Sequence, residues 1–379
     1  MRAKVVPLPA TLQFRRMNDS AATNSAEVVS GRQQPQVKLP LQQVCILWLL
    51  FFLICLGLGY PTLKRYDPAR AEGLTDAIVY RQMVLGSLGP RPHAEVFAGR
   101  ILVPGTAQIF YRTIGARIRS VDPITLSLLL AASIFCATTG ILLIMISHHL
   151  TGNAGVALFA AVLYLISFAV PNFQLAGLID SGESLFMLAL ASLLLLRRWW
   201  LLPLCGIGGA LAKETFVPFA AIFAMTWWVV EERHAARRFV TLGWIGFMIL
   251  SSLATLIAVR SVLFGHMIWP WQIAAALNSG SEFFSSLVRC LSDRSFWYVF
   301  AWLLPLGVFG GRSVPGGWLW PAAITSLCAL VLGAYNDMGG TVARPIFNIA
   351  GPMLSFSVAV LLTRMLSAKQ GASRIGGLT

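Results

Sequence analysis

Ten apolar runs alternate with short polar segments along the chain, and most of them approach the length of a bilayer-spanning helix. Such a helix needs about 20 apolar residues. The pattern predicts an all-α, polytopic membrane protein with about ten transmembrane helices, over residues 44–60, 123–147, 154–170, 183–196, 200–212, 215–230, 239–259, 296–310, 317–335 and 345–363. The runs 200–212 and 215–230 are short, so they form either two tilted helices or a re-entrant hairpin.

The composition agrees with this pattern. Of 379 residues, 57% are hydrophobic and 12% are charged, and the mean hydropathy is +0.73. A soluble domain carries about 25% charged residues, so an ordinary soluble enzyme is excluded. We expect a disordered cytoplasmic tail (1–43), a transmembrane domain (44–365) whose first extracytoplasmic loop is 61–122, and a second cytoplasmic tail (366–379).

The basic residues indicate how the chain is oriented. The net charge is +14, from 29 Lys and Arg against 15 Asp and Glu. With the N-terminus in the cytoplasm, 15 basic residues fall in cytoplasmic segments and five in the later external segments, as the positive-inside rule requires. Ten spans also return the C-terminus to the cytoplasm. This predicts a protein of the cytoplasmic (inner) membrane rather than a nucleic-acid-binding protein.

The remaining nine basic residues lie in the loop 61–122 and indicate an anionic partner, either lipid head groups or a lipid-phosphate ligand. Asp67-Pro68 predicts a helix start, and the helix would carry Glu72, Asp76 and Tyr80 on one face. Further on, an apolar stripe predicts a second helix that lies along the membrane interface rather than crossing it; its members are Val103, Ala107, Phe110 and Ile114.

The scarce acids gather at the predicted external ends of the spans, several of them beside basic residues. A charge inside a bilayer costs about 2.5–3.5 kcal/mol on insertion scales, so such groups usually face a cavity or a partner. Each also has an ordinary explanation, such as a helix cap or a snorkelling side chain. Taken together they predict an external site that contains, besides Asp76 and Glu72, the residues Asp180, Lys213, Glu214, Asp337 and Arg344.

Several segments resemble the GT-C class of polytopic membrane glycosyltransferases, which transfer sugars from polyprenyl-phosphate donors on the extracytoplasmic face. TDAIVYRQMV lies near the start of the long loop, and FAGRILVPGTAQIF resembles an aromatic-x-x-Arg-x-Leu-x-Pro element. LIDSGESLFMLALASLLLL, GALAKETFVPFAAI and NDMGGTVARPIFNIAGPML are similar to later segments of such proteins, in the same order. The resemblance covers roughly residues 44–365 and implies a GT-C-like fold.

The resemblance also implies site roles. The catalytic base of GT-C enzymes is an acid in the first external loop, which corresponds here to Asp76, with Glu72 or Asp67 as substitutes. Many members have two adjacent acids there, whereas Asp76 is followed by Ala77. A carboxylate would deprotonate the acceptor hydroxyl and a cation would bind the donor phosphate; the candidates for that cation are Arg100, Lys213 and Arg344.

The expected partners are membrane lipid, a polyprenyl-phosphate sugar donor and a lipid or glycan acceptor. No cofactor is predicted, although some GT-C enzymes use a divalent cation. Two other classes of function stay open from the sequence. One is a transporter or flippase for a lipid-linked or small anionic substrate, because the segment 200–230 is interrupted as in transporters. The other is a non-catalytic subunit of an envelope-assembly complex.

Overall fold

The structure is a computed structural model that describes residues 40–61, 63, 75–87, 97, 99–115, 117–118, 121–267, 269 and 282–376. Within these ranges every regular element is a helix. The predicted tail 1–43 lies outside the described residues except for its last four. The loop acids Asp67 and Glu72 lie outside them as well, and so does the helix start predicted at Asp67-Pro68.

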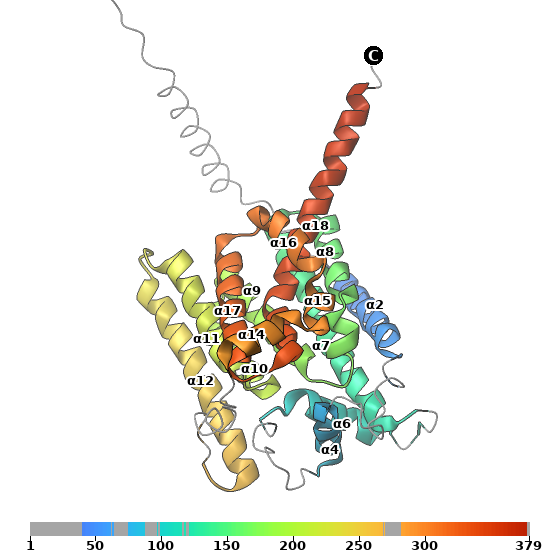
Figure 1. Ribbon diagram of the computed structural model, residues 1–379, viewed down its shortest axis with the longest axis vertical. Coiled ribbons are helices and arrows are strands. Elements are labelled where there is room, and N and C mark those ends of the chain that lie inside the picture. The colour runs from blue at the N-terminus through green and yellow to red at the C-terminus, as the bar shows by residue number, and fades with distance from the viewer. Residues whose placement is uncertain are drawn as a thin grey trace, which may run out of the picture. The chain divides into compact units, whose positions relative to one another are not determined.

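Five helices are long and apolar enough to cross a membrane, so the chain is an α-helical membrane protein (Figure 1). They are α2 (Leu41–Gly59), α7 (Pro123–Thr151), α12 (Arg238–Phe264), α17 (Gly316–Tyr335) and α18 (Ala343–Gly376). In α7 and α18, 72% and 83% of the apolar window is buried inside the protein, against 11% in α2 and 22% in α12. Helices α7 and α18 are therefore central, and α2 and α12 expose most of their surface.

Shorter helices account for the other predicted runs, since each of the ten overlaps a helix. They are α8 (Ala154–Ile166), α9 (Asp180–Leu195), α10 (Leu202–Ala212) and α11 (Phe216–Trp227), and the run 296–310 divides into α15 (Arg294–Phe300) and α16 (Leu303–Gly310). The runs 200–212 and 215–230 form two separate helices, α10 and α11, with a break at Lys213–Thr215. The π-helical turn η1 (Val170–Gln174) follows α8.

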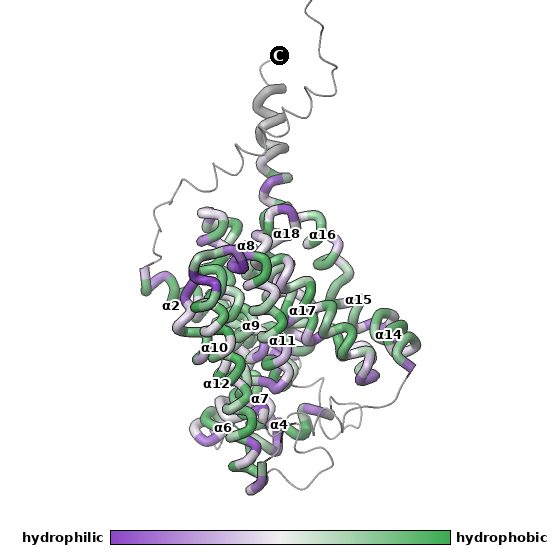
Figure 2. Tube along the Cα trace, turned by 90° about the vertical axis from the view of Figure 1, so that its left-hand side faces the viewer, coloured by the Kyte–Doolittle hydropathy of each residue, from purple (hydrophilic) through white to green (hydrophobic). Residues whose placement is uncertain are grey.

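Two central helices organise the packing. α7 packs against α2, α8 and α9, while α18 packs against α8, α9, α16 and α17. On the other side of α9, α10 packs against α12 and α11 packs against α17. Apolar colouring dominates these helices in Figure 2. The start of α9, the α10–α11 break and the start of α18 are thereby brought to the same region of the helix bundle.

Two loop helices cover this region. They are α4 (Thr75–Leu85) and α6 (Leu102–Ile114), which lie beside the start of α7 in Figure 1. Val103 and Ala107 of α6 are fully buried in a cluster with Leu128 and Ala131 of α7. The stripe that predicted an interfacial helix thus faces the protein in its first half, because α7 offers it a helical partner.

An ion pair at the start of α7 holds α4 in place. Asp122 is the N-cap of α7, where it accepts a hydrogen bond from the Thr125 backbone N–H at 3.1 Å, and Pro123 occupies the first helical position. Arg81 of α4 binds the same carboxylate. Partial burial would raise the pKa of Asp122, but its hydrogen bonds from Arg81 and Thr125 prevail and lower that pKa. The acid therefore stays ionised and keeps α4 attached to α7.

Candidate functional site

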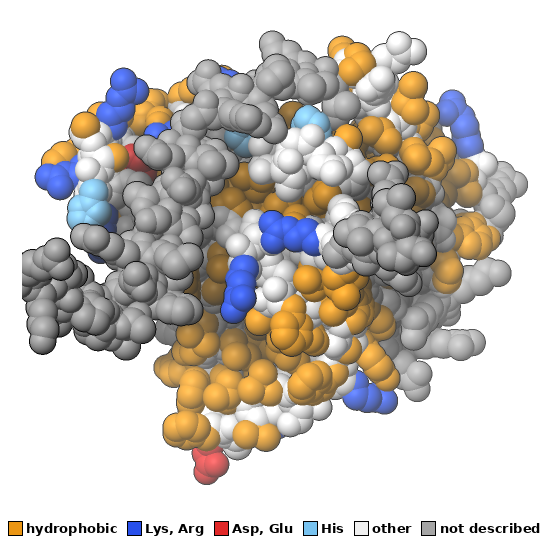
Figure 3. All heavy atoms as spheres, turned by 90° about the horizontal axis from the view of Figure 1, so that it is seen from above, with side chains coloured by type: hydrophobic (Ala, Val, Ile, Leu, Met, Phe, Trp, Pro, Cys, Tyr) orange, Lys and Arg blue, Asp and Glu red, His pale blue; other side chains and the backbone are white. Residues whose placement is uncertain are grey.

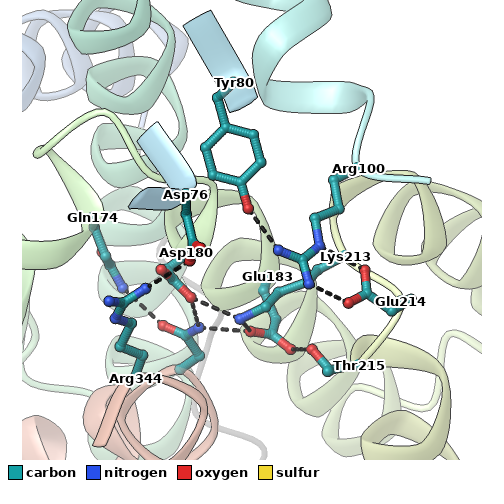
Figure 4. A network of polar contacts seen from close by, with 11 residues as sticks. Asp76, Tyr80, Arg100, Gln174, Asp180, Glu183, Lys213, Glu214, Thr215 and Arg344 are labelled. Atoms are coloured by element: carbon teal, nitrogen blue, oxygen red, sulfur yellow. Dashed lines mark hydrogen bonds and ion pairs between the residues drawn. The ribbon is translucent and has the colours of Figure 1, made fainter. Parts of the chain in front are cut away.

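Eleven polar side chains meet where α4 and the segment before α6 face the helix bundle, in the network drawn in Figure 4. They come from α4, the segment before α6, η1, the start of α9, the α10–α11 break and the start of α18. We call this set the polar cluster; its members are Asp76, Tyr80, Arg100, Gln174, Asp180, Glu183, Lys213, Glu214, Thr215, Arg344 and Asn348.

Lys213 forms ion pairs with two buried carboxylates. Its Nζ lies 2.8 Å from Asp180 Oδ1 and 2.9 Å from Glu183 Oε2. The side chains of Asp180 and Glu183 are 3% and 1% exposed. Thr215 donates a further hydrogen bond to Glu183 Oε1 at 2.5 Å. Because α10 ends in an extended residue, Lys213, the break between the two helices turns this side chain toward the start of α9.

Arg100 makes a two-pronged contact with Glu214. Its Nε donates to Glu214 Oε2 at 2.8 Å, its Nη2 binds the other carboxylate oxygen, and its Nη1 donates to the Tyr80 hydroxyl at 2.6 Å. Burial opposes the charge of Arg100, but Glu214 outweighs it and raises the pKa of Arg100 above its usual value. Burial also raises the pKa of Tyr80 to about 12, so the phenol is neutral.

Arg344 is less fully bonded than the other two cations. Its Nη1 lies 3.4 Å from Asp76 Oδ2, a long contact for a charged pair. Its guanidinium also lies over the ring of Phe173, 5.5 Å from the centroid. Its Nε is buried, and no described residue forms a hydrogen bond with it. The side chain of Asp76 is 33% exposed and that of Arg344 is 13% exposed, so Asp76 is the most accessible carboxylate of the polar cluster.

Neutral side chains also form hydrogen bonds to the buried carboxylates and to one another. Asn348 Nδ2 donates to Glu183 Oε2 at 2.8 Å, and its Oδ1 accepts from Gln174 Nε2 at 3.1 Å. The amide of Gln174 is held in turn by the Tyr164 hydroxyl, which donates to its Oε1 at 3.0 Å and pairs with Ser184 at 2.7 Å. This chain of donors fixes the orientation of the Asn348 amide toward the carboxylates.

The structure brings together six of the eight site residues predicted from the sequence. These are Asp76, Arg100, Asp180, Lys213, Glu214 and Arg344. Asp337 lies elsewhere: it pairs with Arg289 at 2.9 Å and accepts from Ser286 at 2.9 Å. Glu72 is outside the described residues. Within those residues, no group of three or more His, Cys, Asp and Glu side chains is placed to hold a metal ion.

The sequence analysis did not assign five members of the polar cluster to the site. Glu183 and Tyr80 could have been found from their spacing, since each lies one helical turn from a predicted site acid. Gln174, Thr215 and Asn348 are neutral and lie in or beside apolar runs, where nothing in the charge pattern marks them. Buried polar side chains in apolar helices need polar partners, and this requirement alone could have indicated that these three residues belong to the site.

Comparison with known proteins adds no family assignment. No protein-family model matches the chain, and no curated protein is significantly similar to it.

Proposed function

We propose that this chain is an integral membrane glycosyltransferase of the GT-C type. It would move a sugar from a polyprenyl-phosphate donor to an envelope lipid or glycan acceptor. In this proposal the chain has ten spans, both termini are cytoplasmic, and the polar cluster lies at the extracytoplasmic face of the inner membrane. The proposal is supported by the sequence resemblance together with the geometry of the polar cluster, and an assay of sugar transfer tests it.

The observation that carries the proposal is the pairing of Asp76 with Arg344. Glycosyl transfer needs a base for the acceptor hydroxyl and a positive charge for the departing phosphate. Asp76 has the largest exposed fraction of the four carboxylates in the cluster. The guanidinium of Arg344, which can bind two phosphate oxygens, lies 3.4 Å from it. Base and cation are thus adjacent, and the base is the most accessible carboxylate of the cluster.

The geometry divides the cations into two groups. Lys213 is held by Asp180 and Glu183, and Arg100 is held by both oxygens of Glu214. Binding a phosphate at either would break buried ion pairs, and leaving a buried charge unpaired is strongly destabilising. We therefore assign Arg344 to the phosphate, and Lys213 and Arg100 to the framework.

In the proposed reaction, the acceptor hydroxyl gives its proton to the Asp76 carboxylate while its oxygen forms a bond to the anomeric carbon. The bond from that carbon to the phosphate oxygen breaks, and polyprenyl phosphate leaves with the electron pair. Arg344 stabilises the charge that develops on this leaving phosphate.

The test is Asp76→Asn in proteoliposomes that contain a polyprenyl-phosphate sugar mixture and an envelope lipid extract. The amide keeps the shape of the side chain but takes up no proton, so we expect sugar transfer to fall by at least about 100-fold. Glu282→Gln is the matched control, because Glu282 is an exposed acid outside the polar cluster. Full transfer by the Asp76 variant would remove Asp76 from the mechanism.

A transporter or flippase is the second candidate. The observation in its favour is the buried polar chain from Glu183 through Asn348 and Gln174 to Tyr164, since ionisable and polar groups inside a helix bundle are typical of substrate and ion pathways. Uptake of lipid-linked or anionic solutes by proteoliposomes, without any new glycosidic bond, would favour this candidate over the enzyme.

A further inference from the structure

The helix α14 (Phe283–Ser292) lies in a segment that the sequence pattern leaves as an external loop. It packs against α17 and against the short turn η5 (Gly339–Val342), just beyond the last residue of α17. Ser286 and Arg289 bind Asp337 there, and Cys290 is fully buried. One face of α14 is therefore fixed to the end of a membrane-spanning helix.

The rest of the α14 surface is exposed, and it has two chemically different sides. With 100° per residue, Phe284, Val288 and Leu291 form one stripe, and their exposed fractions are 79%, 62% and 36%. About 100° further round lies a polar stripe of exposed residues, Ser285, Arg289 and Ser292. A helix with protein on one side, an apolar stripe on the second and a polar stripe on the third matches a boundary between lipid and water.

The neighbouring helix α15 carries a second, independent sign of this boundary. Trp297 and Tyr298 are each 56% exposed. Amphipathic aromatic side chains of this kind are enriched where membrane meets water. Since α14 has ten residues, it is too short to cross the bilayer, for which about 20 are needed.

We propose that α14 is an interfacial helix that lies in the plane of the membrane, with Phe284, Val288 and Leu291 in the acyl region of the outer leaflet. Its partner is the lipid bilayer. The proposal also gives Asp337 a role, which is to anchor α14 to the end of α17. Because η5 leads directly into α18, Arg344 lies at the same boundary, at the depth of the lipid phosphates. The inference does not depend on glycosyl transfer.

The test compares two spin-labelled variants, Val288→Cys and Ser285→Cys, in phosphatidylcholine–phosphatidylglycerol vesicles. The background carries Cys45→Ala and Cys328→Ala, because the other four cysteines are buried. Both labels lie on the exposed surface within one helical turn. We expect the ratio of collisions with oxygen to collisions with a water-soluble nickel chelate to be several-fold higher at residue 288 than at residue 285.

Equal access of the nickel chelate to both labels would place α14 in water and overturn the proposal. Exclusion of both reagents from residue 288 would overturn it as well, because the apolar stripe would then be covered by protein. Thermal unfolding of each labelled variant, compared with that of the unlabelled background, shows whether the fold is kept. If both of these variants unfold early, Leu291→Cys and Ser292→Cys repeat the comparison on the same two stripes.

Discussion

At the scale of single residues, the cations of the polar cluster differ in how strongly the fold depends on them. Lys213 is 12% exposed and lies between two carboxylates that are almost completely buried. Arg344 faces Asp76, a third of whose side chain is open to solvent. Water can therefore solvate Asp76 if its partner is removed, whereas Asp180 and Glu183 have no such alternative.

We predict that Lys213→Met and Arg344→Met have opposite profiles. Lys213→Met leaves two buried carboxylates without a counter-ion and should cost about 3–5 kcal/mol of stability. Arg344→Met should cost clearly less stability, because water can solvate the partly exposed Asp76, but it should abolish binding of the lipid-phosphate substrate. The measurements are the melting temperature in detergent and the retention of a polyprenyl phosphate by the purified protein. Equal loss of stability in both variants would contradict this division.

The same residues show what the sequence could reveal about the site. Charged residues are rare in this chain, so their positions at helix ends predicted that Asp76, Asp180, Lys213 and Arg344 belong to one site. The pairing within the site could not be predicted, because it depends on how the α10–α11 break and the turn η1 orient their side chains, which the lengths of the apolar runs do not give. Asn348 could not be predicted either, because a neutral amide inside an apolar run changes neither the charge nor the hydropathy enough to be distinctive.

At the scale of helices, α10 and α12 approach each other through Gly206. A Cβ atom there would lie 2.5 Å from Ser252 Oγ and 2.8 Å from the Met248 backbone oxygen. Such distances are far below van der Waals contact, so any side chain would push the two helices apart. The run lengths predicted both helices, but this close approach depends on facing positions that only the folded chain defines.

We predict that Gly206→Ala destabilises the protein by about 1–3 kcal/mol, as overpacking generally does. Gly243→Ala, also in a helix interior, is the control: no described atom lies within 4 Å of a Cβ atom there. Alanine favours a helix over glycine by roughly 0.5–1 kcal/mol, so this variant should be neutral or stabilising. Melting temperatures in one detergent compare the two, and a stable Gly206→Ala would show that α10 and α12 separate freely.

At the scale of the whole molecule, the polar cluster lies at the end of the helix bundle opposite to Arg197, Arg237 and Arg312, which the sequence analysis expects in the cytoplasm. Figure 3 views the end where α18 leaves, and Lys and Arg side chains are more evident there than Asp and Glu. Arg312 precedes α17 at that end, and Met338 follows α17 at the other. The positive-inside rule then predicts that Met338 faces the outside of the cell.

We predict that Met338→Cys reacts with a membrane-impermeant thiol reagent in intact cells, and that Arg312→Cys reacts only after permeabilisation. Both side chains are exposed, so access depends on sidedness alone. The background is again Cys45→Ala with Cys328→Ala. The measurement is the labelled fraction before and after detergent, and the reverse pattern would invert the topology and place the polar cluster in the cytoplasm.

The spacing of the polar cluster along the chain also orders its biosynthesis. Lys213 is 30 residues beyond Glu183 and Asn348 is 165 beyond it. At about 5–20 residues per second, the carboxylates meet their lysine within a few seconds of synthesis but their amide only after roughly ten seconds or more. A nascent chain that ends after α11 already contains Lys213 and Arg100 with their carboxylate partners, whereas Asp76 and Glu183 receive Arg344 and Asn348 only once α18 is made.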